Sequence, residues 1–272
     1  KSNIRMRWLV LFIVSFLFAL NISQIQAEQS LNFLDLTNWS NKGDGTWNVQ
    51  TGGRTVTQTK NGGPTFFLSP DSFSNVIIKG TIEVATTNDN DFIGFVMGYE
   101  NIGDDYNFVL FDWKQEVQNN AQEGFHLALI DGDFSGGFSS SVFWDHDNSD
   151  SRHTELQDPP SKNDGWLDNT EYQFEILYTS ERIRIKINDE TIYNVTSGAF
   201  NPGKIGFYNS SQDNVIYGNV RVVNVDSNLE NPQAADDTYG LVTSNGITLN
   251  VGADEGLLFN DYDPQLDAFE II

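Results

Sequence analysis

Cysteine is absent from the 272-residue sequence, which excludes disulfide bonds, thiolate metal sites and cysteine nucleophiles. Only three histidines are present, and they leave little material for zinc chemistry or for a histidine general base. Lys and Arg are also scarce, with 15 of them against 38 Asp and Glu, so the net charge is −23. Because an acidic surface repels phosphate groups, neither nucleic acid nor an anionic membrane surface is expected as a partner.

The first 27 residues have the pattern of a secretory signal peptide. Basic residues precede the apolar run "WLVLFIVSFLFAL", and a polar stretch then ends on the small residue Ala27. The run is short for a bilayer-spanning helix, which needs roughly 20 apolar residues; an uncleaved signal anchor is the alternative. We therefore expect a secreted protein, outside the cell or at its surface, with no membrane insertion after signal cleavage.

The rest of the chain reads as β-strands, because apolar residues recur at every second position. This alternation is clear in "VIIKGTIEV" (residues 76–84), "EYQFEILY" (171–178) and "RIRIKIN" (182–188). By contrast, "FIGFVMGY" and "FVLFDW" are apolar on both faces, as in strands that are covered on both sides. No amphipathic helix of useful length is present. The pattern predicts an all-β sandwich of two antiparallel sheets with a core rich in aromatic residues.

Four motifs occur in an order that resembles a known family. They are "DNDFIGFVMGY", "YNFVLFDWKQ", "DGWLDNTEYQFEILY" and "GKIGFYNSSQDNVIYGNVRV". Together they resemble the thrombospondin C-terminal domain over roughly residues 71–225, although the cysteine pair of that family is missing. The resemblance implies a concanavalin A-like jelly roll of the L-type lectin kind. We expect this domain to occupy residues 28–226, with its opening strands in 28–70.

The composition changes after this domain. Residues 227–233 form a polar linker, and residues 234–272 then contain "AADDTY" and "GLLFNDYDP". These segments resemble the opening of the cadherin-like or Ig-like tandem repeats of large bacterial surface proteins. We expect a truncated repeat with a partial β structure here, within a longer surface protein.

Carboxylates beside the apolar strands are the candidate metal ligands. Hard carboxylate oxygens are what calcium prefers, and the family resemblance implies calcium near the loop that carries Asp89 and Asp91. The alternative is that both are solvated loop residues next to a core strand. The acidic run "WDHDNSDSRH" has hard-ligand spacing but lacks the glycine of an EF-hand. The full set of candidate calcium ligands is Asp89, Asp91, Asp145, Asp147, Asp213, Asp261 and Asp263.

Two other functions compete with calcium-dependent adhesion. Glycosidases of this architecture carry an E-x-D-x-x-E strand, whereas "EYQFEILY" offers only Glu171 and Glu175, so no enzymatic activity is expected. A lectin would use exposed aromatic side chains, for which Trp113, Trp144 and Trp166 are candidates, with core packing as the alternative for each. The sequence therefore predicts a secreted, non-catalytic, calcium-binding adhesion module whose partner is a glycan or a matrix or cell-surface protein.

Overall fold

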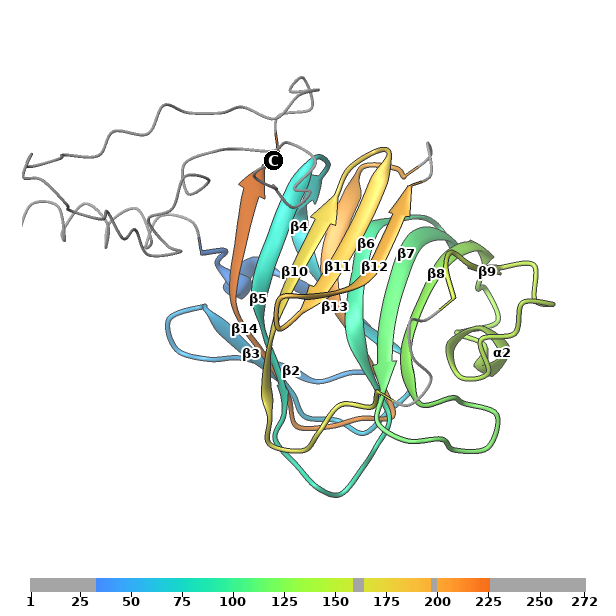
Figure 1. The fold of residues 1–272 in the computed structure, drawn as a ribbon, viewed down its shortest axis with the longest axis horizontal. Coiled ribbons are helices and arrows are strands. Elements are labelled where there is room, and N and C mark those ends of the chain that lie inside the picture. The colour runs from blue at the N-terminus through green and yellow to red at the C-terminus, as the bar shows by residue number, and fades with distance from the viewer. Residues whose placement is uncertain (1–32, 159–163, 197–199, 226–272) are drawn as a thin grey trace, which may run out of the picture. The chain divides into compact units, whose positions relative to one another are not determined.

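The computed structural model describes residues 33–158, 164–196 and 200–225, which form two seven-stranded sheets packed face to face (Figure 1). Neighbouring strands pair antiparallel, and the predicted all-β jelly-roll sandwich is confirmed. The signal peptide (1–27), the linker (227–233) and the cadherin-like segment (234–272) lie outside the described residues, so those expectations stay predictions.

Sheet A contains the cleanly alternating segments of the sequence. Its inner face supplies aliphatic and aromatic residues to the core, while its charged residues face outward, as the period of two requires. The turn between β11 and β12 places Asn188 and Asp189 at φ 49° and 65°, the conformation of a tight hairpin turn. In spatial order the strands are β12 (Glu190–Thr196), β11 (Arg182–Ile187), β10 (Glu171–Tyr178), β5 (Val76–Val84), β14 (Val215–Asn224), β3 (Thr55–Gln58) and β2 (Trp47–Val49).

Sheet B contains the two strands that are apolar on both faces. In β6, one set of side chains faces sheet A: Ile93, Phe95 and Met97. The alternate set belongs to a second apolar cluster on the opposite face: Phe92, Val96 and Tyr99. In spatial order the strands are β1 (Ser40–Gly43), β4 (Thr65–Phe73), β13 (Gly203–Ser210), β6 (Phe92–Ile102), β7 (Asp105–Lys114), β8 (Gly124–Asp133) and β9 (His153–Glu155).

The second cluster exists because residues 134–152, here called the covering segment, fold over the outer face of sheet B between β8 and β9. Phe138 and Phe143 of this segment pack on Phe66 of β4, with ring centroids 5.3 and 6.1 Å apart. The sequence-based expectation that β6 and β7 are covered on two sides is thus confirmed. The covering segment also brings a polar loop over the end of the sheet where β7 finishes.

Helices are short in the described part of the chain. They are α2 (Ser140–Phe143), within the covering segment, and the 3₁₀ turn η1 (Leu36–Asn38). Neither is long or apolar enough to cross a membrane.

Candidate functional site

Three of the predicted calcium ligands meet at one end of sheet B: Asp89, Asp91 and Asp213, here called the acidic cluster. β6 pairs antiparallel with β13, so the residues just before β6 lie beside those just after β13. The backbone N–H of Asp91 accordingly donates to the Gln212 side chain at 2.9 Å. Burial raises the pKa of Asp89 above its usual value, and the charges of Asp91 and Asp213 raise it further.

A buried lysine is the counter-ion of this cluster. Lys114, the last residue of β7, is fully buried, and its Nζ lies 2.5 Å from Oδ1 of Asp91. The same ammonium group donates to the Asn90 carbonyl at 3.1 Å and lies 5.1 Å from the ring centroids of Phe92 and Trp144. Lys114 therefore compensates Asp91, one of the three carboxylates of the cluster.

Two N–H groups donate to the Asp89 carboxylate. The side-chain amide of Asn61 donates to Asp89, and the backbone N–H of Asn90 donates to Asp89 at 3.1 Å. Carboxylate oxygens, which Asp89, Asp91 and Asp213 supply, are ligands of calcium rather than of softer metals. The residues present therefore fit calcium by their chemistry, with Asp89, Asp213 and the second oxygen of Asp91 as the groups that would hold it.

The other predicted ligands lie elsewhere. Asp145 and Asp147 are in the covering segment, where Asp147 is exposed and its carboxylate accepts the Ser149 backbone N–H at 2.8 Å. Hydrogen bonds from Ser149 lower the pKa of Asp147. Their role as calcium ligands stays a prediction. Asp261 and Asp263 lie outside the described residues.

Two of the three tryptophans considered for sugar stacking are core residues. Trp113 is 3 % exposed and Trp166 is fully buried, with its indole N–H donating to the Asp91 carbonyl at 3.1 Å. A sugar cannot stack on a ring that the protein already encloses, so the lectin hypothesis is wrong for these two side chains. Trp144 is half-buried over Lys114.

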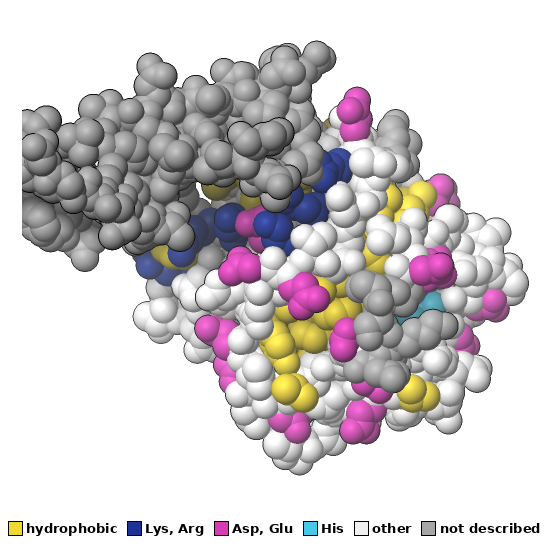
Figure 2. All heavy atoms as spheres, in the orientation of Figure 1, with side chains coloured by type: hydrophobic (Ala, Val, Ile, Leu, Met, Phe, Trp, Pro, Cys, Tyr) yellow, Lys and Arg dark blue, Asp and Glu magenta, His cyan; other side chains and the backbone are white. Residues whose placement is uncertain are grey.

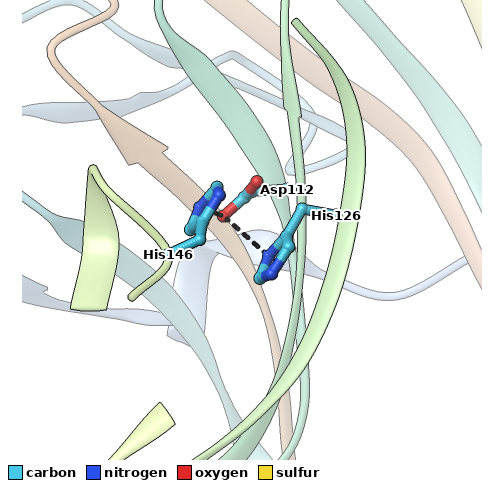
Figure 3. A group of neighbouring side chains, drawn as sticks. All are labelled: Asp112, His126 and His146. Atoms are coloured by element: carbon cyan, nitrogen blue, oxygen red, sulfur yellow. Dashed lines mark hydrogen bonds and ion pairs between the residues drawn. The ribbon is translucent and has the colours of Figure 1, made fainter. Parts of the chain in front are cut away.

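All three histidines of the chain meet in one place, which the sequence analysis missed. Asp112 of β7 lies directly opposite His126 of β8 in the antiparallel register, and His146 reaches them from the covering segment (Figure 3). Oδ2 of Asp112 lies 3.0 Å from Nε2 of His146 and 3.9 Å from Nδ1 of His126. His153 is the first residue of β9, and its Nε2 lies 3.2 Å from Nε2 of His126.

This histidine cluster is screened from water. Asp112 is fully buried, and its Oδ1 has no hydrogen-bond partner among the described residues. Burial, with the neighbouring histidines, lowers the pKa of His126 well below its usual value. Burial and the charge of His146 also lower the pKa of His153 to about 4, although the negative charge of Asp112 raises it. His126 and His153 are therefore neutral at pH 7.

One signal in the sequence could have indicated the histidine cluster. Asp112 interrupts the apolar strand "FVLFDW", and His126 lies in the alternating strand "GFHLALI", on the same face as Ala128 and Ile130. Their direct opposition depends on the register between β7 and β8, and the arrival of His146 depends on the path of the covering segment. Neither is visible in a single sequence.

Comparison with known proteins places the chain in a family. Residues 42–226 match the thrombospondin C-terminal region family, which is more than half of the chain. Thrombospondin-3b of Danio rerio is 28% identical over 194 residues, covering 65% of this chain and 20% of that protein. Cartilage oligomeric matrix protein of Homo sapiens is 27% identical over 195 residues, covering 65% of this chain and 25% of that protein. The chain thus matches about a fifth to a quarter of the length of these relatives.

Solved structures with a similar fold are more distant. A carbohydrate-binding module from Bacillus subtilis has a TM-score of 0.48 at 14% identity and covers 70% of this chain and 98% of its own. The kappa-carrageenase of Pseudoalteromonas carrageenovora has a TM-score of 0.40 at 11% identity and covers 70% of this chain and 90% of its own. One is a binding module and the other an enzyme, and likenesses this weak say nothing of function. By its family match, the chain belongs to the thrombospondin C-terminal region family.

Proposed function

We propose that this domain is a non-catalytic, calcium-stabilised adhesion module of a larger secreted or cell-surface protein. The observation that supports this proposal most strongly is the acidic cluster, in which Asp89 lies beside the charges of Asp91 and Asp213 and only Asp91 is shown to pair with the buried ammonium group of Lys114. Membership of a family whose relatives include cartilage oligomeric matrix protein favours an extracellular role. The resemblance of residues 234–272 to cadherin-like repeats supports the further proposal that tandem repeats follow the module in a longer protein.

Calcium would act on the loops of this end of the sandwich. Asp89 and Asp91 precede β6, and Asp213 lies between β13 and β14, so one ion on all three would connect segments far apart in sequence. It would also cancel the mutual repulsion that adds to the effect of burial in raising the pKa of Asp89. Extracellular calcium sites of about 10⁻⁴–10⁻³ M affinity are filled outside the cell, where such an ion would hold the loops in one arrangement.

A surface for the partner is suggested by the distribution of cations. Acidic side chains are scattered over the face in Figure 2, whereas Lys and Arg gather in one band. On sheet A, Lys79 and Lys186 lie 2.6 and 3.5 Å from the Glu175 carboxylate. Nearby, the guanidinium groups of Arg54 and Arg221 flank the Phe33 ring at 4.5 and 4.6 Å.

This basic band favours an anionic glycan as the partner. Phe33, Lys79, Glu175 and Arg221 line a hollow of about 460 Å³. The opposite face of the sandwich is less suitable, because the covering segment occupies the outer side of sheet B. A matrix or cell-surface protein with an acidic segment, or a neutral glycan bound as by a lectin, is the alternative.

The calcium part of the proposal is tested by thermal melts of the protein in calcium, in magnesium and in excess EDTA. A site filled to one hundred times its dissociation constant adds about 2.7 kcal/mol, which is roughly 5–11 °C in Tm for a domain of this size. We expect that gain with calcium only, and we expect its loss in Asp89→Asn and Asp213→Asn but not in the exposed control Asp71→Asn. Identical melts in calcium and EDTA would remove calcium from the proposal.

The partner is tested separately on an immobilised sulfated polysaccharide. Binding should weaken with added salt, since exposed charges are screened, and should be lost in Lys79→Ala combined with Arg221→Ala. The control is Lys204→Ala, which removes a cation from sheet B. If the double variant still binds, the basic band is not the binding surface. If the protein hydrolyses the polysaccharide, and substitution of a single carboxylate abolishes that hydrolysis, the non-catalytic role is contradicted.

A further inference from the structure

We propose that Asp112, His126 and His146 form a binding site for a divalent first-row transition metal, of which zinc suits the ligands best. This inference does not depend on the calcium proposal. It concerns different residues and a different kind of donor, because imidazole nitrogens bind zinc and its neighbours, whereas calcium takes oxygen ligands. Two histidines and a carboxylate are a common ligand set of zinc sites that keep a fourth position open.

The spacing of the donor atoms is close to that of a metal site. Zinc bonds of about 2.0–2.1 Å in tetrahedral geometry put neighbouring ligand atoms roughly 3.3 Å apart. Here the Asp112 carboxylate lies 3.0 Å from the His146 nitrogen and 3.9 Å from the His126 nitrogen, and the three ligand atoms lie within 4.8 Å of one another. The two distances from the Asp112 oxygen differ from the expected value by well under 1 Å, whereas the two imidazole rings have to move relative to each other.

A chain of hydrogen bonds fixes which nitrogen of His126 carries its proton. Both atoms of the Asn148 amide pair with Glu155, and this assigns Oδ1 of Asn148 as the acceptor facing Nδ1 of His153 at 3.0 Å. In the Nδ1–H tautomer that this contact selects, His153 accepts at Nε2, so the 3.2 Å contact is a donation from Nε2–H of His126. Nδ1 of His126 is left with a lone pair on the side of Asp112.

This arrangement leaves two electron-rich atoms facing each other without a proton between them. Nδ1 of His126 lies 3.9 Å from Oδ2 of Asp112 and has no hydrogen-bond partner among the described residues. In a site screened from water, such a pairing is unfavourable unless a cation lies between the two atoms. His153 supplies the outer hydrogen bond that orients a ligating imidazole in many metal sites.

The rings have to separate when the ion binds. His126 and His146 are stacked, with centroids 3.7 Å apart and an angle of 3° between their planes, whereas a metal lies close to the plane of each ligating imidazole. Because His126 is held in strand β8, we expect the His146 ring to be the one that moves when the two rings separate. That residue belongs to the covering segment and has a φ of 47°, in a loop rather than in a strand.

The cluster also shares a cross-strand row with a buried phenol. Tyr208 of β13 lies opposite Gly94 of β6, which in turn lies opposite Asp112. The Tyr208 hydroxyl has no partner among the described residues, and burial together with the charge of Asp112 raises its pKa. Because Gly94 has no side chain, nothing on β6 stands between the phenol and the carboxylate along this row.

The experiment is calorimetric titration of untagged, chelator-treated protein with Zn²⁺, in the presence of excess Ca²⁺. We expect one Zn²⁺ per chain. Asp112→Asn, His126→Gln and His146→Gln remove a direct ligand, and each should weaken binding by more than about 100-fold. His153→Gln removes only the outer hydrogen bond and should cost about 10–100-fold. The matched control is Asp131→Asn, an exposed carboxylate on the same strand as His126, which should bind Zn²⁺ normally.

A second measurement keeps the proposal testable if a buried substitution prevents folding. His146→Gln lies on the covering segment and should fold, as judged by near-ultraviolet circular dichroism. The visible spectrum of the Co²⁺-loaded protein reports nitrogen ligation and coordination number directly, and the intensity expected for four ligands should disappear in His146→Gln. Absence of stoichiometric Zn²⁺ binding, or equal binding by folded His146→Gln, would overturn the assignment.

Discussion

Lys114→Met isolates the energetic role of the one cation buried in the acidic cluster. The substitution keeps the length of the side chain, and its apolar end can pack on the rings of Phe92 and Trp144, which already lie 5.1 Å from the ammonium group. What is lost is the 2.5 Å ion pair with Asp91, both partners of which are buried. Removing one member of a buried pair costs about 3–5 kcal/mol, because the other charge is left uncompensated.

This loss should be visible as a fall in Tm measured in EDTA. At about 2–4 °C per kcal/mol for a domain of this size, the expected decrease is roughly 6–20 °C. The control is Lys60→Met, which removes an ion pair with Asp44 whose partners are 45% and 58% exposed and should change stability by about 0–1 kcal/mol.

The dependence on calcium adds a second readout. With Lys114 gone, Asp91 has lost its ion-pair partner and adds an uncompensated charge to the cluster, so the Tm gain on adding calcium should be larger in Lys114→Met than in the unsubstituted protein. The double variant Asp91→Asn, Lys114→Met has no uncompensated charge from this pair and should recover part of the loss. A melt of Lys114→Met in EDTA that matches the Lys60→Met control would refute the reasoning.

Two further predictions concern sheet A and the covering segment. Burial raises the pKa of Glu175, but its hydrogen bond to Lys79 and the charges of Lys79, Lys186 and Arg184 outweigh this and lower it below its usual value of 4.5. Glu175→Gln should therefore cost roughly 1 kcal/mol at pH 7, after discounting for solvent screening. That difference should vanish as the pH falls through the lowered pKa; chemical denaturation at several pH values measures it, and a pH-independent difference would contradict the account. Phe143→Ala removes a buried ring, typically worth about 3–5 kcal/mol, and should reduce hydrogen-exchange protection of the covering segment more than that of β6 and β7; unchanged protection would contradict the packing described for it.

Much of the fold could be predicted from the sequence because strands leave a periodic signal. The alternation in residues 182–188 indicates one buried face, and the unbroken apolar run from Phe92 indicates two. The second face of β6 had to be covered by something, but no local pattern indicated that residues 134–152 would cover it. Its phenylalanines, Phe134, Phe138 and Phe143, are separated mostly by glycine and serine and do not follow the alternation of a strand.

The candidate sites were predictable only where the ligands flank a strand. Asp89 and Asp91 could be identified because two carboxylates stand directly before an apolar strand. Their buried partner Lys114 could not, since a lysine at the end of a strand is normally exposed. The histidine cluster was missed for a related reason. Asp112 and His126 are ordinary residues individually, and only the register of β7 against β8 makes them neighbours.

The covering segment has a consequence for how this family can diversify. It leaves the sandwich at the end of β8 and returns at β9, which pairs with β8 itself, as in the register of Ile130 with His153. An insertion whose two ends are held together by the same ladder can change in length at little entropic cost and without altering strand order. Related sequences could therefore differ in the whole of residues 134–152 and keep the sandwich. Such an exchange would replace His146, the ligand that this segment supplies to the proposed metal site.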